Sequence, residues 1–315
     1  MTQGFFYHTR PFTKLLLVLF LMVCCYLIFL GIGILLAVPF FKIPPGEVVQ
    51  ILQNNETDQH IGLLKFLQVL YSTGLFLVPA ILSGFLIQHN AWRFLHADRI
   101  SGYWVIILVI TLMVISIPWI NFTSWLNEKL ALPERWGGLM DKIRESDEES
   151  WDLMKAYLQT DHIGGLLINV IMIALIPALG EEFLFRGTIQ RIFTEWFGNE
   201  HLAVWLAAMV FSLMHYQFLG LVPRVMLGAL FGYLFVWTGS IWIAVLAHFV
   251  NNCLAVVYYY VFYQGKLEIE ADQIGMEKNA ALMIMASVVL TTLILSLIQK
   301  QRTESVHPRM GDPDQ

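Results

Sequence analysis

Long apolar runs separated by short polar loops set the pattern of this chain. A helix needs about 20 consecutive apolar residues to cross the hydrocarbon core of a bilayer, and eight segments come close to that length. These segments are residues 15–40, 61–87, 103–120, 164–185, 202–218, 221–237, 241–262 and 280–298. The pattern therefore predicts an all-α polytopic membrane protein with about eight transmembrane helices.

The composition supports the membrane class. Of the 315 residues, 57% are hydrophobic and 14% are charged, and the mean hydropathy is +0.64. A soluble domain carries about a quarter charged residues. The basic residues form no stripe, so we expect no nucleic-acid partner. Cys24, Cys25 and Cys253 lie inside apolar runs without a CxxC spacing, which supports neither a disulfide framework nor a thiolate metal site.

The charges of the loops predict the orientation. Basic residues gather at the N-terminus, in the loop at 88–102, after the fourth run and in the C-terminal tail, whereas the loops between them are acidic. Because basic loops stay on the cytoplasmic side, we expect both termini in the cytoplasm. Arg224, in a turn assigned to the other side, is the exception. We expect an integral, multi-pass protein in the plasma membrane of a bacterium, surrounded by the lipid bilayer.

The runs and loops divide the chain into five regions. Within the acidic stretch after the third run, Trp151, Met154 and Leu158 have helical spacing, which predicts an amphipathic helix near the membrane surface. The expected regions are 1–126, an N-terminal three-helix membrane region; 127–163, an extramembrane acidic loop with that helix; 164–262, a membrane core; 263–299, an acidic loop and the last transmembrane helix; and 300–315, a disordered tail.

Ionisable residues within membrane spans are costly, and they usually face a cavity or a partner. In this chain they cluster in the fourth, fifth and seventh runs, while the first three runs and the last are almost free of them. The polar residues of this cluster are Glu181, Glu182, Arg186, His215, His248 and Asn252. Such clustering on three runs favours one shared hydrophilic site.

Helical spacing decides which of these side chains are neighbours. Glu182 and Arg186 are four residues apart and can neutralise each other on one face. Glu181 is rotated by about 100° from Glu182 and has no local partner, which suits a general base. In the same way, His215 shares a face with Phe211, four residues earlier in the chain.

Each residue also has a purely structural interpretation. The Glu182–Arg186 pair could tie the end of a helix, and His215 could be a hydrogen-bonded core histidine. Asn252, which shares a face with His248, could join two helices through its amide. Phe211 is more typical of packing than of a cofactor site. What these interpretations leave unexplained is the coincidence of a carboxylate, two imidazoles and an amide on helices that can line one cavity.

The residue types favour hydrolysis of an amide without a serine or cysteine nucleophile. A glutamate and an imidazole can deprotonate and orient water, while a second imidazole and a carboxamide can donate hydrogen bonds to an oxyanion. Glu181, His215 and His248 are equally acceptable ligands for a divalent metal such as zinc. The HExxH motif is absent, so the residues leave the metal-dependent and metal-free alternatives open.

Three segments resemble a known family. "EEFLFRG", "FSLMH" and "HFVNN" are similar to the EExxxR, FxxxH and HxxxN motifs of the CAAX prenyl protease and bacteriocin-processing (CPBP, Abi) family, over roughly residues 164–262. The resemblance implies an eight-helix intramembrane endopeptidase with its catalytic core on the fourth to seventh spans. It implies that Glu181 and His215 activate water, that His248 and Asn252 stabilise the oxyanion, and that Glu182, Arg186 and Phe211 shape the site.

The substrate and two other functions stay open. The resemblance implies a peptide or membrane-protein substrate, and prenylation of that substrate is not specified by the motifs. Intramembrane glutamate and histidine also form proton relays, so a proton-coupled transporter is an alternative, although no internal symmetry of the kind found in transporters is evident. The third alternative is a non-catalytic immunity or scaffold protein of the same fold.

Overall fold

The computed structural model describes residues 3–54, 57–129, 137–277 and 279–306, and every regular element in these residues is helical. The first half contains α1 (Pro11–Phe41), α2 (Pro45–Asn54), α3 (Thr57–Ser72), η1 (Thr73–Leu77), α4 (Val78–Gln88), α5 (Ala91–Phe94), α6 (Tyr103–Ile115), α7 (Ile117–Glu128) and α8 (Gly137–Leu158). The second half contains α9 (Ile163–Asn169), η3 (Val170–Leu175), α10 (Ile176–Leu184), η4 (Phe185–Gln190), α11 (Arg191–Phe197), α12 (Glu200–Leu213), α13 (Leu221–Thr238), α14 (Ile241–Tyr263), η5 (Ala271–Gln273) and α15 (Ala280–Val306).

The described helices confirm an all-α integral membrane protein but not the count of eight spans. Six helices are long and apolar enough to cross a membrane, and α6 with α7, bent by 44°, makes a seventh if the pair is one span. The predicted span at 202–218 is instead α12, a helix of 14 residues. At 1.5 Å per residue α12 is about 21 Å long, which is shorter than the roughly 30 Å hydrocarbon core.

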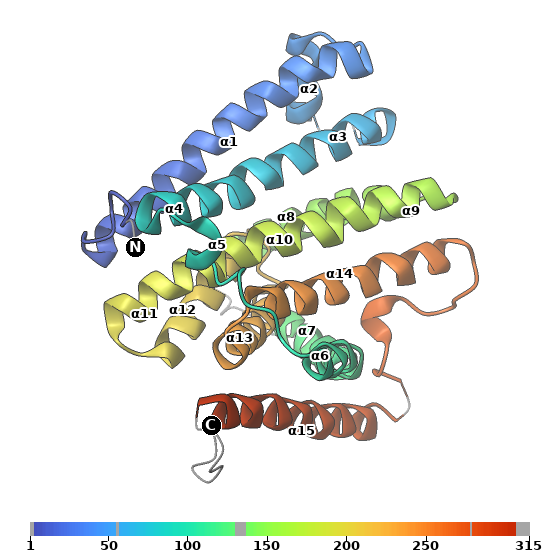
Figure 1. Cartoon of the computed structure of the whole chain (residues 1–315). Helices are drawn as coiled ribbons and strands as arrows, with labels where there is room; N and C mark the ends of the chain where they lie inside the picture. The colour runs from blue at the N-terminus through green and yellow to red at the C-terminus, as the bar shows by residue number, and fades with distance from the viewer. Residues whose placement is uncertain (1–2, 55–56, 130–136, 278, 307–315) are drawn as a thin grey trace, which may run out of the picture.

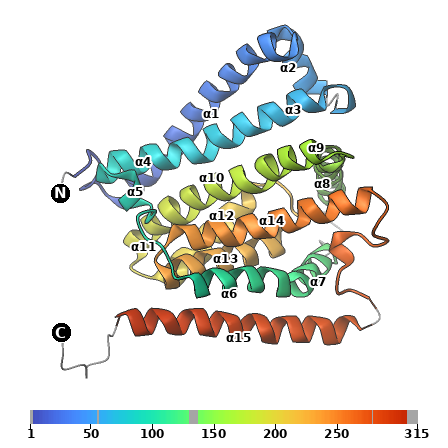
Figure 2. The same ribbon diagram turned by 45° about the vertical axis from the view of Figure 1, so that its right-hand side comes forward.

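The helices form layers with the predicted membrane core in the middle. Figures 1 and 2 show α1 and α15 at opposite outer edges, with α10, α13 and α14 between them. Both views also show that α1 begins and α15 ends at the same end of the bundle. This arrangement agrees with termini on one side of the membrane; that the side is cytoplasmic stays a prediction.

Two prolines shape long helices of the bundle, and the second of these helices carries Glu181, Glu182 and Arg186. The π-helical segments η1 and η3 end just before Pro79 and Pro177, respectively. Proline has no N–H, and its ring pushes on the carbonyl four residues earlier, so the helix widens there. In the second case the carbonyl that loses its usual donor is that of Ile173.

The amphipathic helix predicted in the acidic stretch is α8. Its Leu158 packs with Val256 and Tyr259 of α14 in a buried cluster, and Met154 lies against that cluster. The Trp151 ring meets the Tyr259 ring edge-on, with centroids 5.8 Å apart. The predicted apolar face is therefore confirmed, and it holds α8 against the membrane core.

The last helix extends into the segment that the sequence predicts as a disordered tail. The last helix continues to Val306, several residues beyond residue 300, because the helical pattern continues through polar residues that extend past the apolar run. Residues 307–315 lie outside the described part of the chain.

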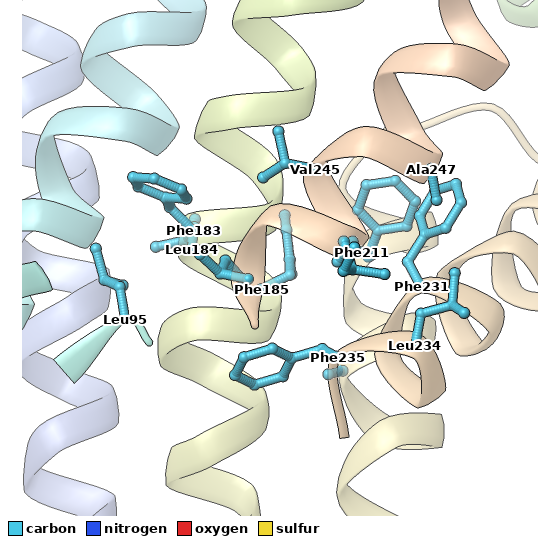
Figure 3. Close-up of a cluster of buried hydrophobic side chains, with 14 of the residues drawn as sticks. Leu95, Phe183, Leu184, Phe185, Phe211, Phe231, Leu234, Phe235, Val245 and Ala247 are labelled. Carbon is cyan, nitrogen blue, oxygen red and sulfur yellow. The ribbon is translucent and has the colours of Figure 1, made fainter. Parts of the chain in front are cut away.

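The largest apolar cluster surrounds the polar residues that the sequence singled out. Figure 3 shows Phe183 and Phe185 from the α10–η4 helix, and Phe211 and Phe231 from α12 and α13, gathered between these helices. All four rings are buried. Polar groups placed among them are thus removed from water, so their contacts with one another decide what they can do.

Candidate active site

The ion pair predicted within the fourth run is present. Arg186 Nε lies 3.0 Å from Glu182 Oε2, and both side chains are almost completely buried. Arg186 lies in the first turn of η4, a π-helical segment. Such segments are frequent at functional sites. The pair is confirmed, and its burial makes each charge dependent on the other.

Aromatic rings and one backbone carbonyl complete the surroundings of Arg186. Its Nη2 donates to Gly228 O at 3.1 Å, and its guanidinium carbon lies 4.7 Å from the centroid of Phe211 and 5.7 Å from that of Phe231. A Cβ on Gly228 would lie only 3.1 Å from the Cβ of Ala208 and 3.3 Å from Arg186 Nη2. The glycine therefore lets α13 approach α12 and the guanidinium.

Glu182 also holds His248, a contact that links α10 to α14. His248 Nδ1 lies 2.8 Å from Glu182 Oε1. Because this carboxylate is paired with Arg186, it accepts, and Nδ1–H donates. The Phe231 ring stacks on the imidazole, with centroids 5.1 Å apart and an angle of 20° between the planes. The hydrogen bond and the stacking fix the ring, and they direct its Nε2 away from Glu182.

His215 is oriented in the same manner by its own helix. Its Nδ1 lies 2.9 Å from Phe211 O, and since a carbonyl only accepts, Nδ1 carries the proton. The Phe211 ring meets the imidazole edge-on at 4.8 Å. Nε2 of His215 is thus left as an acceptor, and 30% of the side chain is exposed, so water can reach it.

Both free imidazole nitrogens point at Glu181. Glu181 Oε2 lies 4.0 Å from His215 Nε2 and 3.9 Å from His248 Nε2. Two groups hydrogen-bonded to one water molecule lie about 4.0–4.6 Å apart. The three side chains are therefore spaced to share a water rather than to bond one another directly.

The same distances test the metal alternative. Two ligands of one tetrahedral zinc lie about 3.4 Å apart, which is shorter than either distance from Glu181 Oε2. Within the described ranges, no group of three or more His, Cys, Asp or Glu side chains is arranged to hold a metal ion. The residues as placed do not fit a zinc site.

The structure gives Asn252 partners of its own. Its Nδ2 donates to Ile173 O at 3.0 Å, and its Oδ1 accepts from Asn251 Nδ2 at 3.1 Å. The Ile173 carbonyl is the one that Pro177 leaves without its usual helical donor. Asn252 thereby joins α14 to η3, as its structural interpretation expected, while its second Nδ2 hydrogen stays free of these two bonds.

The loop that follows His215 is tied down by residues that the sequence did not single out. Asn127, at the end of α7, donates from Nδ2 to Phe218 O at 3.1 Å and to Leu219 O at 2.7 Å. Its Oδ1 accepts from Val222 N at 3.0 Å. From α8, Asp147 Oδ2 accepts from Leu219 N at 2.6 Å. Through Asp147, α8 thus reaches the loop that follows His215.

Arg224 is the second residue with an unforeseen position. Its guanidinium binds Gln217 through Gln217 O and Oε1 and interacts electrostatically with Asp147 and Glu181. In the sequence, Arg224 was only an exception to the charge pattern of the loops, and nothing linked it to the site. A lone basic residue at the start of a span is the signal that could have marked it.

Replacing Asn127 by alanine should destabilise the protein by about 1–3 kcal/mol, because two carbonyls and one N–H lose their buried partner. The loop after His215 should loosen, and hydrogen exchange at Leu219 and Val222 should rise. Exchange measured by mass spectrometry checks this, with Ser146→Ala, an exposed residue of α8, as the control. Unchanged protection in the Asn127→Ala protein would contradict the tethering role.

Comparison with known proteins adds a family to this geometry. The family model described as type II CAAX prenyl endopeptidase Rce1-like matches residues 163–254. The uncharacterized protein YpbD of Bacillus subtilis (strain 168) is 28% identical over 90 residues, which cover 27% of this chain and 43% of that protein. The match thus spans less than half of that relative. No solved structure matches the chain.

The matched segment contains all the polar residues described above that come from α10, η4, α12 and α14. Glu181, Glu182 and Arg186 lie in its first third, His215 in its second half, and His248 with Asn252 near its end. The three motifs thus occur in one family domain, in the expected order. Residues 163–254 of the chain thus match the model of the Rce1-like CAAX prenyl endopeptidases, a family of proteases.

Proposed function

We propose that this protein is an intramembrane endopeptidase that hydrolyses a peptide bond with water activated by Glu181 and His215. One observation carries the proposal: both imidazole Nε2 atoms approach the same carboxylate oxygen, Glu181 Oε2, at 4.0 and 3.9 Å, while both Nδ1 atoms are bonded elsewhere. That arrangement leaves one site for a water molecule, in which Glu181 and His215 accept its hydrogens while His248 Nε2 faces the same carboxylate oxygen.

The first step is attack by water. A water molecule held between Glu181 Oε2 and His215 Nε2 donates hydrogen bonds to both, since each is an acceptor. Glu181 takes one proton as general base while the water oxygen bonds to the carbonyl carbon of the peptide. The electron pair of the carbonyl moves onto its oxygen, which becomes the oxyanion.

His248 is suited to stabilise that oxyanion. Donation by Nε2 requires a proton on both ring nitrogens, and the Glu182 carboxylate 2.8 Å from Nδ1 balances the resulting charge. Asn252 contributes its second Nδ2–H in this scheme. When the C–N bond breaks, Glu181 returns the proton to the leaving nitrogen, so the carboxylate is regenerated.

The substrate is a peptide or a membrane-protein segment that reaches this buried site. Phe211 and Phe231 wall the site with rings, which suits apolar side chains next to the scissile bond. The proposal covers prenylated and unprenylated substrates alike. It includes an orientation with both termini in the cytoplasm. We also propose that the membrane is a bacterial plasma membrane, which agrees with the Bacillus subtilis origin of the relative.

The purified protein, reconstituted in liposomes, should cleave members of a library of soluble and membrane-anchored peptides in excess EDTA. Mass spectrometry of the products checks this, and an empty-liposome sample is the control. Cleavage that disappears in EDTA and returns with zinc would instead assign Glu181, His215 and His248 as metal ligands. Peptide or proton flux without cleavage would favour a transporter, and neither activity would favour a scaffold.

A further inference from the structure

A cavity of about 620 Å³ lies at the end of the bundle where α1 begins and α13 ends, apart from the candidate active site. It is formed between α1, the loop after α5, η4, α11 and the C-terminal end of α13. Figure 1 shows these elements together at one end of the bundle. None of the residues in the three family motifs lines this cavity.

Several basic side chains line the cavity. Arg99, Arg191 and His96 line it. Arg99 and Arg191 are close enough to interact as like charges, and burial, with these two charges, lowers the pKa of His96 to about 4. The imidazole is therefore neutral near pH 7. Two guanidiniums facing one cavity repel each other unless an anion lies between them.

The acidic residues nearby are in part already occupied. Lys14 Nζ lies 2.8 Å and 2.9 Å from the two carboxylate oxygens of Glu195, so this pair is neutral and joins α1 to α11. Arg191 packs its guanidinium 4.8 Å from the ring centroid of Phe94. Glu195 also attracts Arg191, and Glu200 is the second carboxylate of the lining. Lys14, Arg99 and Arg191 outnumber these two carboxylates, so with His96 neutral the lining keeps a net positive charge.

Three buried polar atoms around the cavity lack a hydrogen-bond partner among the described residues. They are Arg191 Nη1, His96 Nδ1 and Gln190 Oε1. Gln190 is 2% exposed, and its Nε2 donates a hydrogen bond to Gly232 O at 3.3 Å. Buried groups without partners are costly, and three of them on one cavity indicate that something polar occupies it.

The chemistry of these groups is specific. The guanidiniums are donors that match phosphate oxygens, whereas Gln190 Oε1 can only accept. A ligand that satisfies both carries a phosphate and also an O–H or N–H. Lys14 lies in the first turn of α1, and Phe235 to Thr238 form the last turn of α13. The cavity is therefore close to the helix ends, where the headgroup layer, roughly 5–8 Å thick on each side of the hydrocarbon core, is expected.

We propose that this cavity binds a phosphate-bearing ligand whose phosphate lies between Arg99 and Arg191 and whose O–H or N–H donates to Gln190. The ligand is either the headgroup of a phospholipid or a free phosphate. Among lipids, phosphatidylglycerol and phosphatidylethanolamine meet this requirement. Phosphatidylcholine has the phosphate but no O–H or N–H on its headgroup.

Native mass spectrometry of the detergent-purified full chain tests the proposal, with each of the three lipids and with inorganic phosphate as separate probes. We compare wild type with Arg99→Gln and Arg191→Gln; Arg93→Gln, in the same region but outside the cavity, is the matched control. Arg99 is exposed, so its variant keeps the test valid if loss of the half-buried Arg191 impairs folding.

We expect wild type and Arg93→Gln to retain phosphatidylglycerol or phosphatidylethanolamine in preference to phosphatidylcholine. Binding should weaken about tenfold or more in the Arg99 and Arg191 variants, the effect of losing one hydrogen bond to a charged group. Binding of inorganic phosphate alone, with the same loss in the variants, identifies a free phosphate as the ligand. Equal binding by wild type and Arg99→Gln, or no binding of any probe, overturns the proposal.

Discussion

Replacing Glu181 by glutamine should lower the rate of peptide cleavage by about 10²–10⁴-fold, the usual contribution of a general base. The amide keeps the size of the carboxylate but cannot take a proton from water. The geometry makes Glu181 the common neighbour of His215 and His248, so no second carboxylate replaces it; Glu182 is occupied by Arg186 and His248.

Single-turnover cleavage of the peptide identified in liposomes measures this effect, together with the thermal unfolding of each protein. Glu268→Gln, the same chemical change in the exposed loop after α14, is the control and should behave as wild type. The melting temperature of the Glu181→Gln protein should stay close to that of wild type. Cleavage by Glu181→Gln at the wild-type rate would refute the assignment of the base.

Replacing Glu182 by glutamine should destabilise the protein by about 3–5 kcal/mol, because Arg186 would be left as a buried charge without its partner. Both side chains are almost fully buried, so water cannot replace the carboxylate. This is the largest effect on stability that we expect from a single substitution at the site. Chemical denaturation, or thermal unfolding in a mild detergent, measures it.

The double variant Glu182→Gln/Arg186→Met separates stability from catalysis. Removing the positive charge should restore most of the lost stability, since apolar replacement of a buried ion pair is often neutral. The glutamine can still accept from His248 Nδ1, but it carries no charge to balance the imidazolium. We therefore expect kcat to stay about 100-fold or more below wild type, with little change in KM.

Recovery of both stability and kcat in the double variant would show that Glu182 acts only as the structural partner of Arg186. Recovery of stability alone identifies Glu182 as a positioning residue for His248. This comparison resolves the question that the spacing of Glu182 and Arg186 left open. It is informative because Glu182 divides its two oxygens between the two partners.

Neighbours on one helix could be predicted from the sequence. The Glu182–Arg186 pair and the shared face of Phe211 and His215 follow from 3.6 residues per turn, and both are present. The apolar face of α8 was predictable for the same reason. The length of the span at 202–218 was not, because α12 ends at Leu213 and Tyr216 adopts a left-handed backbone with φ 54°, which hydropathy does not signal.

Contacts between helices needed the folded protein. His248 lies 66 residues from Glu182, and spacing along one helix fixes neither its rotation nor its depth against another helix. The hydrogen bond of Asn252 likewise depends on the position at which Pro177 leaves the Ile173 carbonyl without a helical donor. The hydrogen bonds that hold the loop after His215 depend on how closely α7 and α8 approach that loop.

The sequence by itself determined the membrane class, the local pairs and the three family motifs, because hydropathy and helical periodicity act over a few turns of one chain segment. Only the tertiary structure decided that Glu182 serves Arg186 and His248 together, and that Glu181 faces two imidazoles across the width of one water molecule. Those relations depend on how buried helices rotate to satisfy their polar groups, and packing among the surrounding rings fixes that rotation.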